Sequence, residues 1–304
     1  MKSYRIALLP GDGIGPECMD ATRTVLERMV TQISGLDLTF TVEKREGEPL
    51  GVCDPRPAST PPSGALTTLP DGVVPADVEG YILVPEGRLR QEYGNTAING
   101  VMTAVDQVAA ATSNAVIRID ADTNGKNAYD AWDGNPCSIE ASNDVVRAIG
   151  VVLDGLDETM PNASTVTLVG DHIMIPMGLV ADGNTIGNEN TYDPGVEPGF
   201  DTSLTAALKA GYVMTDTPYA ASAGYLLNAA ELYLPDRAVG RLVEGPAEIL
   251  ATLERFVEFD GVLDPDTTTS AFVAGYDFIA DGAEATADVI DQQIDPETAA
   301  RLIS

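Results

Sequence analysis

Apolar and polar residues follow two kinds of pattern along the chain, and together they predict both strands and helices. Stretches of strand length, either apolar throughout or alternating with polar residues, occur at 36–42, 80–84, 165–169 and 212–215. Apolar residues recur every three or four positions at 18–33 and 141–153, which predicts amphipathic helices. Towards the end of the chain, further helical segments are predicted after residues 264–267 and at 283–294.

The first apolar run, residues 6–9, stops at Pro10 and leads into a loop with three glycines, Gly11, Gly13 and Gly15. Glycine lets the backbone approach a ligand closely, and proline at position 16 suits a first helical turn because its missing N–H costs nothing there. The pattern predicts a strand, a turn and a helix, with space for a phosphate or carboxylate near the helix start. A tight strand-to-helix connection without a ligand is the alternative interpretation.

Length and composition indicate a folded globular protein. A chain of 304 residues that is 44% hydrophobic is long enough to bury a substantial core in one large or two ordinary domains. No apolar run approaches the ~20 residues that a membrane-spanning helix needs, and the N-terminal run is too short for a secretion signal. We therefore expect a cytoplasmic protein without membrane partners.

The chain is strongly acidic, with 47 Asp and Glu against 17 Lys and Arg and a formal net charge of −30. This charge argues against binding to nucleic acid or to anionic membranes, because both need clustered Lys and Arg. The acidic residues are spread along the chain, as in cytoplasmic proteins of salt-loving organisms. In such organisms concentrated salt screens the repulsion between the acidic side chains.

The chain has three cysteines, Cys18, Cys53 and Cys137, without the spacing of a zinc site. An odd number of cysteines in a protein expected to be cytoplasmic favours three reduced thiols and no disulfide.

The string Pro10-Gly-Asp-Gly-Ile-Gly-Pro-Glu17 resembles the opening of the isocitrate and isopropylmalate dehydrogenase family. These enzymes decarboxylate 2-hydroxy diacids oxidatively, with NAD(P) and a divalent metal. The resemblance implies that a loop of Gly11, Asp12, Gly13, Ile14 and Gly15 binds the cofactor. Residues 243–249 are similar to the family's adenosine-binding segment, with its histidine replaced and one residue missing. Glu248 stands where an acidic residue bonds the adenosine ribose, so NAD is the expected cofactor.

Two arginines are implied to hold the substrate carboxylates. Arg90 lies in a Leu-Arg pair similar to the family's, and Arg118 lies in residues 114–125, which are similar to the family's strand Val-Val-Arg-Glu-Asn-Thr-Glu-Gly. Arginine suits this task because its planar fork binds a carboxylate through two parallel hydrogen bonds. A further family arginine is absent, since residues 97–99 are Ala, Ile and Asn. For Arg88 and Arg90, solvated surface charges are the alternative.

Two residues are candidates for proton transfer. The resemblance implies that Tyr129 is the acid that protonates the enol after decarboxylation, and a half-buried packing tyrosine is the alternative. The family's basic lysine is missing from the run 169–178. His172, the one histidine of the sequence, stands within a residue or two of that position and is the candidate base. A histidine satisfied by the local backbone is the alternative, because no partner carboxylate is identifiable.

The family holds Mg²⁺ or Mn²⁺ with three aspartates, and this chain departs from that pattern. Asp201 is similar to the first of them. Small neutral residues within 217–224 replace the other two, and Asp216 stands several positions away. Hard cations need several oxygen ligands, so we expect Mg²⁺ or Mn²⁺ binding to be weak or lost.

The resemblance runs through nearly the whole chain and implies the family's α/β fold, a large sheet flanked by helices in two domains with a cleft between them. The first, cofactor-side domain is expected to be discontinuous, from residues 1–95 and 236–304. The second, residues 96–235, is expected to form a homodimer and to bind substrate.

The resemblance leaves two functions open. One is NAD-dependent oxidation of a 2-hydroxy diacid, with the standard activity weak or lost because the lysine and two aspartates are missing. The other is a non-catalytic descendant that acts as a dicarboxylate- or nucleotide-binding protein or as a structural dimer.

Overall fold

The computed structural model describes residues 2–8, 36–42, 53–183, 188, 203–221, 224–227, 230–259, 261, 282, 284–286 and 288. The chain divides into two compact units, residues 1–249 and residues 250–304. The elements discussed below lie in the first unit, apart from a helix that runs across the boundary. The predicted cofactor loop at Gly11 to Gly15, the metal candidate Asp201 and the predicted helix at 18–33 lie outside the described residues.

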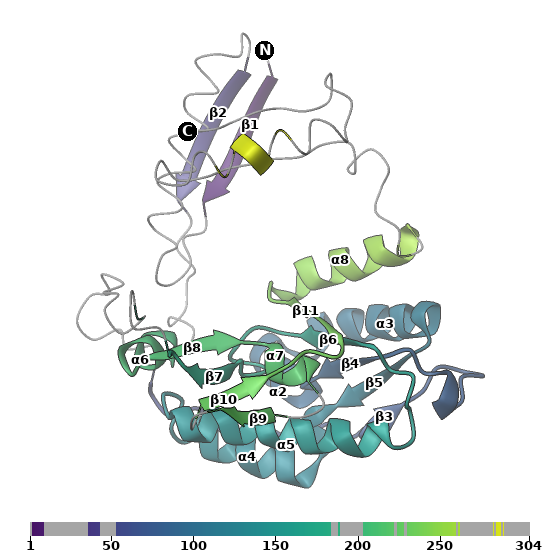
Figure 1. The fold of residues 1–304 in the computed structure, drawn as a ribbon. Coiled ribbons are helices and arrows are strands. Elements are labelled where there is room, and N and C mark those ends of the chain that lie inside the picture. The colour runs from purple at the N-terminus through teal and green to yellow at the C-terminus, as the bar shows by residue number, and fades with distance from the viewer. Residues whose placement is uncertain are drawn as a thin grey trace. The chain divides into compact units, whose positions relative to one another are not determined.

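The main sheet has five strands, and four of them are parallel (Figure 1). Its order is β11 (Ala238–Leu242), β6 (Thr165–Val169), β4 (Gly80–Val84), β5 (Asn114–Arg118) and the short antiparallel β3 (Thr67–Thr68). The strands predicted at 80–84 and 165–169 are confirmed.

Strand β4 lies near the middle of the sheet because its sequence can be buried on both faces. All five residues of Gly-Tyr-Ile-Leu-Val are buried, as expected for a parallel strand between two others. The Tyr81 hydroxyl still finds a polar partner, the Asp157 carboxylate at 2.9 Å. Glycine is required at position 80, because a Cβ there would lie 2.0 Å from the Thr165 hydroxyl of β6.

Helices cover both faces of this sheet. After β4 come α2 (Glu86–Tyr93) and α3 (Asn95–Thr112), and after β5 come α4 (Thr123–Asp133) and α5 (Ile139–Asp157). Figure 1 shows α4 and α5 side by side on one side of the sheet and α3 on the other. Because β6 and β5 flank β4 on opposite sides, right-handed crossovers place the two helix pairs on opposite faces.

The long helix α5 contains the predicted helix at 141–153, which is thereby confirmed. The Ser138 side chain caps its first turn by accepting a hydrogen bond from the Ala141 N–H at 3.1 Å. The buried residues Val145, Ile149 and Leu153 recur at four-residue intervals and form its inward face.

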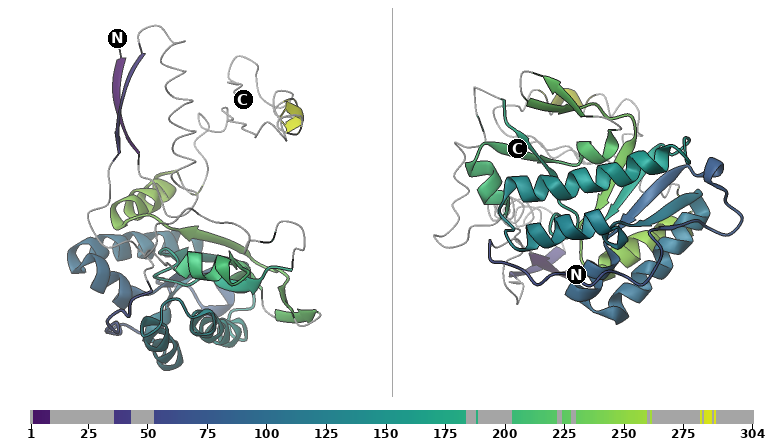
Figure 2. Two further views of the ribbon diagram at one scale, coloured as in Figure 1. Left: turned by 90° about the vertical axis from the view of Figure 1, so that its left-hand side faces the viewer. Right: turned by 90° about the horizontal axis from the view of Figure 1, so that it is seen from below.

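The remaining described elements lie outside the main sheet and its two helix pairs, and Figure 2 gives two further views of the ribbon. The predicted strands at 36–42 and 212–215 are confirmed. The described strands outside the main sheet form three pairs: β1 (Lys2–Leu8) parallel to β2 (Leu36–Val42), β7 (Gly178–Ala181) antiparallel to β8 (Tyr212–Thr215), and β9 (Gly224–Leu227) antiparallel to β10 (Ala230–Tyr233). The other elements are the 3-10 turns η1 (Pro75–Asp77) and η2 (Ile119–Ala121) and the helices α6 (Ser203–Lys209), α7 (Thr217–Ala220) and α8 (Pro246–Glu258).

The protein is therefore α/β, with a mixed, mainly parallel sheet flanked by helices. Strands β4 and β11 come from the ranges predicted as the first domain, and β5 and β6 come from the range predicted as the second. The predicted division into domains at residues 95 and 235 stays a prediction.

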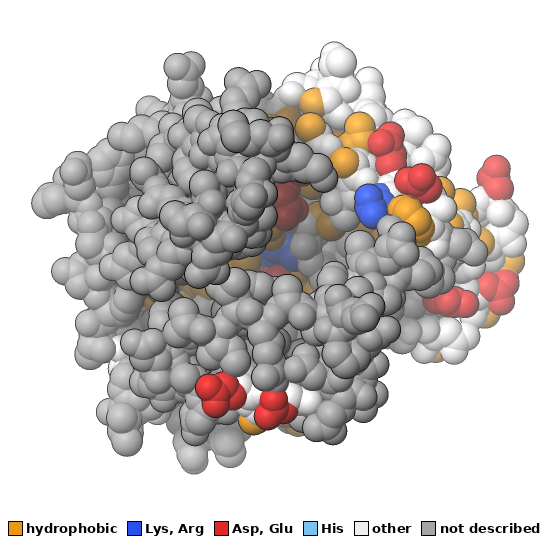
Figure 3. All heavy atoms as spheres, turned by 90° about the horizontal axis from the view of Figure 1, so that it is seen from above, with side chains coloured by type: hydrophobic (Ala, Val, Ile, Leu, Met, Phe, Trp, Pro, Cys, Tyr) orange, Lys and Arg blue, Asp and Glu red, His pale blue; other side chains and the backbone are white. Residues whose placement is uncertain are grey.

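Acidic side chains are scattered over the described part of the face in Figure 3 and do not gather in one patch. This agrees with the even spread of Asp and Glu in the sequence. Among the described residues, no helix is both long and apolar enough to cross a membrane.

Cys53 and Cys137 form a disulfide, with their Cα atoms 5.1 Å apart. The expectation of three reduced thiols is wrong for these two residues. Their separation of 84 residues hides the pair in the sequence, because only the fold brings residue 53 to the connection between α4 and α5. The Arg56 N–H reinforces the contact by donating to the Asp133 carbonyl at 2.7 Å.

Reduction of this disulfide should lower the free energy of unfolding by roughly 2–4 kcal/mol, because an 84-residue cross-link restricts the unfolded chain. Denaturant unfolding followed by circular dichroism, with and without dithiothreitol in concentrated salt, measures the change. Cys53→Ser should match the reduced protein, whereas Cys18→Ser should keep the response to reductant. Equal stability of the oxidised and reduced protein would contradict the prediction.

Candidate functional site

The two predicted substrate arginines meet at one carboxylate, that of Glu86. Arg90 Nε donates to Glu86 Oε1 at 2.9 Å, and Arg118 Nε donates to Glu86 Oε2 at 2.6 Å. Arg90 Nη2 lies 2.7 Å from the same Oε1. Both carboxylate oxygens of Glu86 are thus engaged by guanidinium groups. The structure brings Arg90 and Arg118 together around a residue of the protein itself, and their role in binding a substrate stays a prediction.

The fold explains why these three side chains meet. Strands β4 and β5 are parallel neighbours with Val84 opposite Arg118, so both strands end at the same edge of the sheet. Glu86 begins α2 two residues after β4 ends, and Arg90 follows one helical turn later. The carboxyl ends of parallel strands are the usual place for a ligand site in an α/β protein.

Sequence reasoning missed Glu86, although a signal was present. Glu86 directly follows a buried strand and precedes Arg90 by four residues, the spacing at which two helical side chains face each other. Burial opposes ionisation of Glu86, but the hydrogen bonds from Arg90 and Arg118 outweigh burial and lower its pKa. Glu86 is therefore a carboxylate at neutral pH.

A pocket of about 580 Å³ opens beside this cluster, a volume in the range of small-molecule sites. One wall is the segment 60–63, and the other is the start of α2, with Glu86, Gly87, Arg90 and Gln91, together with Asn95. Arg118 does not line the pocket. It lies behind Glu86 and also donates through Nη1 to the Thr68 hydroxyl at 2.7 Å.

Asp120 holds the start of α2, which forms one wall of the pocket. Its Oδ2 accepts hydrogen bonds from the backbone N–H groups of Gly87 at 2.7 Å and Arg88 at 3.1 Å, at the start of α2. These N–H groups have no partner inside the helix, so Asp120 acts as a cap supplied by another element. Burial raises the pKa of Asp120 to about 6 despite these hydrogen bonds.

Tyr129 lies in the core on α4 and is not among the residues that line the pocket. Its hydroxyl donates to the Met174 carbonyl at 2.9 Å, and the Arg88 guanidinium lies 4.4 Å from the centre of its ring. Burial raises the pKa of Tyr129. In this arrangement Tyr129 packs and orients its neighbours, and its role as an acid stays a prediction.

His172 is half-buried beside Trp132, with the ring centres 5.6 Å apart. The Met177 N–H donates to its Nδ1 at 3.0 Å, while its Nε2 is buried and has no hydrogen-bond partner among the described residues. Burial lowers the pKa of His172 to about 3, and the positive charges of Arg241 and Arg56 contribute. His172 is therefore neutral at physiological pH and a weak base, and its catalytic role stays a prediction.

The remaining predicted residues lie away from the pocket or outside the described chain. Glu248 accepts a hydrogen bond from the Gly245 N–H at 3.2 Å at the start of α8 and is exposed. Asp216 pairs with Arg241, whose Nε and Nη2 lie 2.9 and 2.6 Å from its two oxygens. Within the part of the chain that the structure describes, no group of three His, Cys, Asp or Glu is placed to hold a metal ion.

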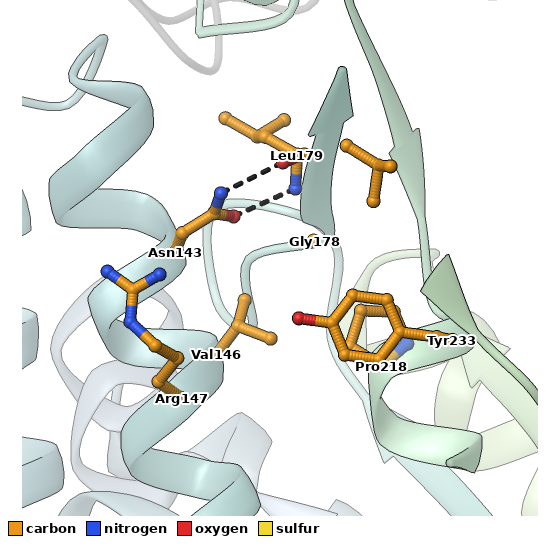
Figure 4. A pocket seen from close by; sticks show the side chains of 8 residues that line it. Asn143, Val146, Arg147, Gly178, Leu179, Pro218 and Tyr233 are labelled. Carbon is orange, nitrogen blue, oxygen red and sulfur yellow. Dashed lines mark hydrogen bonds between the residues drawn. The ribbon is translucent and has the colours of Figure 1, made fainter. Parts of the chain in front are cut away.

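A much smaller cavity, about 10 Å³, lies between α5 and β7 (Figure 4). Asn143 lies at its edge and uses both ends of its amide: Nδ2 donates to the Leu179 carbonyl at 2.8 Å, and Oδ1 accepts from the Leu179 N–H at 2.9 Å. A cavity of this size holds about one water molecule. We therefore interpret this cavity as part of the packing contact between α5 and β7, and not as a ligand site.

Comparison with known proteins finds partial similarity to one kind of enzyme. The chain is 44% identical over 61 residues to a 3-isopropylmalate dehydrogenase of Parasynechococcus marenigrum, a match that covers 20% of this chain and 17% of the relative. A 3-isopropylmalate dehydrogenase of a Synechococcus species is 43% identical over 61 residues, with the same coverage. One of Prochlorococcus marinus is 50% identical over 40 residues, which is 13% of this chain and 11% of the relative.

These matches span less than a fifth of the relatives' own length, so they indicate a relation in part of the chain. No family model matches the chain, and no solved structure matches it.

Asp133→Asn should lower the free energy of unfolding by about 3 kcal/mol, because it leaves the buried Arg88 guanidinium without its ionic partner. Asp144→Asn is the matched control: Asp144 pairs with Arg147, and both side chains are about half exposed. That change should cost less than about 1 kcal/mol. Urea unfolding of the three proteins in the same salt measures both effects, and similar losses for the two variants would contradict the prediction.

The stability of the protein should depend on pH through His172. Its folded pKa of about 3 lies below the ordinary value of 6.5, so the unfolded chain takes up a proton first as the pH falls. The contribution of His172 is fully present above pH 6.5 and is lost towards pH 3, with a slope of up to about 1.4 kcal/mol per pH unit.

His172→Gln removes this titration, so the stability of the wild type relative to the variant should fall between pH 6 and pH 4. Subtracting the two curves cancels the opposite contribution of Asp120, whose raised pKa favours the folded state at low pH. A difference that stays constant over this range would contradict the prediction.

Proposed function

We propose that the protein is a divergent relative of 3-isopropylmalate dehydrogenase that binds a small 2-hydroxy acid at Arg90. The observation that carries the proposal is the convergence of Arg90 and Arg118 on one carboxylate, beside a pocket of about 580 Å³ at the carboxyl ends of β4 and β5. Guanidinium groups that hold the Glu86 carboxylate in this geometry have the kind of hydrogen-bond donors that a ligand carboxylate needs. The partial identity to 3-isopropylmalate dehydrogenases also supports it.

The proposal extends to NAD and to the architecture of the family. NAD would bind through Gly11 to Gly15 and Glu248. The protein would have two domains with a cleft between them and would form a homodimer in the cytoplasm. NAD supplies a hydride acceptor when bound. The eight-residue match at Pro10 to Glu17 is the feature of the sequence that supports this cofactor.

Oxidative decarboxylation of the family's kind is proposed to be weak or lost. Metal-assisted hydride removal needs a base and several carboxylate ligands, and the sequence lacks the family's lysine and two of its aspartates. His172, the candidate base, has a lowered pKa and a buried Nε2. The hydroxyl of Tyr129, the candidate acid, already donates a hydrogen bond to the Met174 carbonyl.

A non-catalytic binding protein is the second candidate function, and the same two residues favour it. Tyr129 and His172 each have a partner in the protein and lie outside the pocket lining, so the pocket can hold an acid without reacting with it. In this case the protein binds a carboxylate or nucleotide, or serves as a structural dimer.

Arg90→Gln should weaken the binding of 2-hydroxy acids by at least about tenfold, because it removes the one guanidinium that lines the pocket among the described residues. Isothermal titration calorimetry in concentrated salt measures this. Arg147→Gln, which changes an exposed arginine on α5, is the control and should leave the affinity unchanged. Equal affinity of Arg90→Gln and the wild type would refute the proposed site.

An activity assay separates the two candidate functions. The protein is mixed with NAD⁺, Mn²⁺ and a panel of malates and isocitrate in concentrated salt, and the reduced nicotinamide absorbance is followed. Turnover would exclude the non-catalytic alternative. Binding of a 2-hydroxy acid without turnover would favour it.

A further inference from the structure

The charge balance of the candidate site says what kind of acid it takes, an inference that rests on the proposed function. We propose that Glu86 stands where the second carboxylate of a diacid would bind, so that the site takes a 2-hydroxy acid with a single carboxylate. Two positive charges, those of Arg90 and Arg118, face the negative charge of Glu86. These three paired side chains carry a net charge of +1, which one ligand carboxylate neutralises; Asp106, which interacts electrostatically with Arg118 and Glu86, opposes any further anion.

The hydrogen-bond donors of Arg118 lead to the same conclusion. Its Nε donates to Glu86 and its Nη1 to Thr68, and it does not line the pocket. A Cβ at Gly64 would lie 2.9 Å from Arg118 Nε, so the chain also covers this arginine closely from the side of residue 64. Arg118 therefore serves the internal carboxylate and is not available to a ligand.

Arg90 is the cation that faces the pocket, and part of its fork is also occupied. Nε and Nη2 contact Glu86, and Nη1 donates to the Asn99 side chain at 2.8 Å and, at longer distances of 3.4 and 3.5 Å, to the carbonyl and the side chain of Asn95. Each terminal nitrogen of a guanidinium carries two hydrogens, so the second hydrogen of Nη2 remains for a ligand carboxylate, which can also replace the long contacts of Nη1 to Asn95. Its side chain is also the most exposed of the three, at 25% against 13% for Arg118 and 12% for Glu86.

A second ligand carboxylate would meet like charges here. Glu86 lines the pocket as an anion, and Asp106 interacts electrostatically with both Arg118 and Glu86. Two carboxylates close together disfavour each other's charged forms. A diacid would have to displace Glu86 from both arginines, which would leave a largely buried carboxylate without partners.

The sequence-based expectation was a diacid held by two arginines. The structure modifies it, because one of the two carboxylates that these arginines hold belongs to the protein. The internal carboxylate is favoured because Glu86 lies on the same helix as Arg90. It therefore contacts the arginines without the loss of entropy that binding a separate molecule would cost.

The test compares L-lactate with L-malate, which share a 2-hydroxy acid group and differ by one carboxylate. Calorimetric titration at neutral pH and constant ionic strength is carried out on the wild type, Glu86→Gln and Arg90→Gln. The wild type should bind lactate more tightly than malate. In Glu86→Gln the affinity ratio of malate to lactate should rise by at least about tenfold, because the freed arginines accept a second carboxylate.

The outcomes separate this inference from the proposed function. If lactate and malate both bind through Arg90 and their ratio is unchanged in Glu86→Gln, the inference on Glu86 is overturned and the carboxylate site stands. If the wild type prefers malate, the inference is also overturned. If neither acid binds to the wild type or to Glu86→Gln, both proposals fail.

Thermal unfolding followed by circular dichroism shows whether Glu86→Gln is folded. Should the variant not fold, the preference of the wild type for lactate over malate decides the matter alone, since it needs no substitution. Binding to the folded wild type in which malate equals or exceeds lactate would then overturn the inference.

Discussion

The buried pairing of Arg88 with Asp133 is the interaction on which the position of α2 depends. Arg88 Nη1 and Nη2 lie 2.7 and 3.0 Å from the two oxygens of Asp133, and both side chains are almost fully buried. Arg88 also donates to the Ile173 carbonyl at 3.0 Å, in the connection that follows β6. One guanidinium thus joins α2, α4 and that connection. Because Glu86 and Arg90 lie two residues to either side on α2, the pair also sets the direction of the candidate site.

The same use of arginine recurs across the first unit and explains how so acidic a chain builds its interior. Arg241 on β11 pairs with Asp216 and donates to the carbonyls of Gly170, Asp171 and Ile175 at 2.9, 3.1 and 2.8 Å. These carbonyls lie in the connection after β6, and that of Asp171 also accepts hydrogen bonds from the backbone N–H groups of Met174 and Ile175. Positive side chains are scarce in this sequence, and several of them act as internal connections between elements.

At the candidate site the two predicted substrate arginines hold a carboxylate of the protein itself. Arg90 and Arg118 keep the positions that suit carboxylate binding, yet Glu86 occupies the space between them. Tyr129 and His172 are engaged by backbone groups of the connection after β6. The arginines predicted to bind a carboxylate therefore lie together at the candidate site, while the candidate groups for proton transfer have partners elsewhere in the protein. A relation in part of a chain does not by itself carry over a relative's chemistry, because a fold constrains packing more than reactivity.

The sequence by itself determined several strands, among them β4 directly before the site, because the apolar run at 80–84 and the alternating run at 165–169 have the pattern of strands in a sheet. It did not predict α2, which carries Glu86 and Arg90. The sequence also indicated Arg90 and Arg118 as candidate residues, through short stretches that are similar to the dehydrogenase family. Tertiary structure alone decided that these arginines share Glu86 and that Cys53 pairs with Cys137 over 84 residues. It likewise decided that Tyr129 and His172 turn towards backbone groups. The physical reason is that the contacts and burial of a side chain depend on which distant segments of the chain meet in the fold. The pattern of apolar and polar residues in one segment indicates only whether that segment is a helix or a strand.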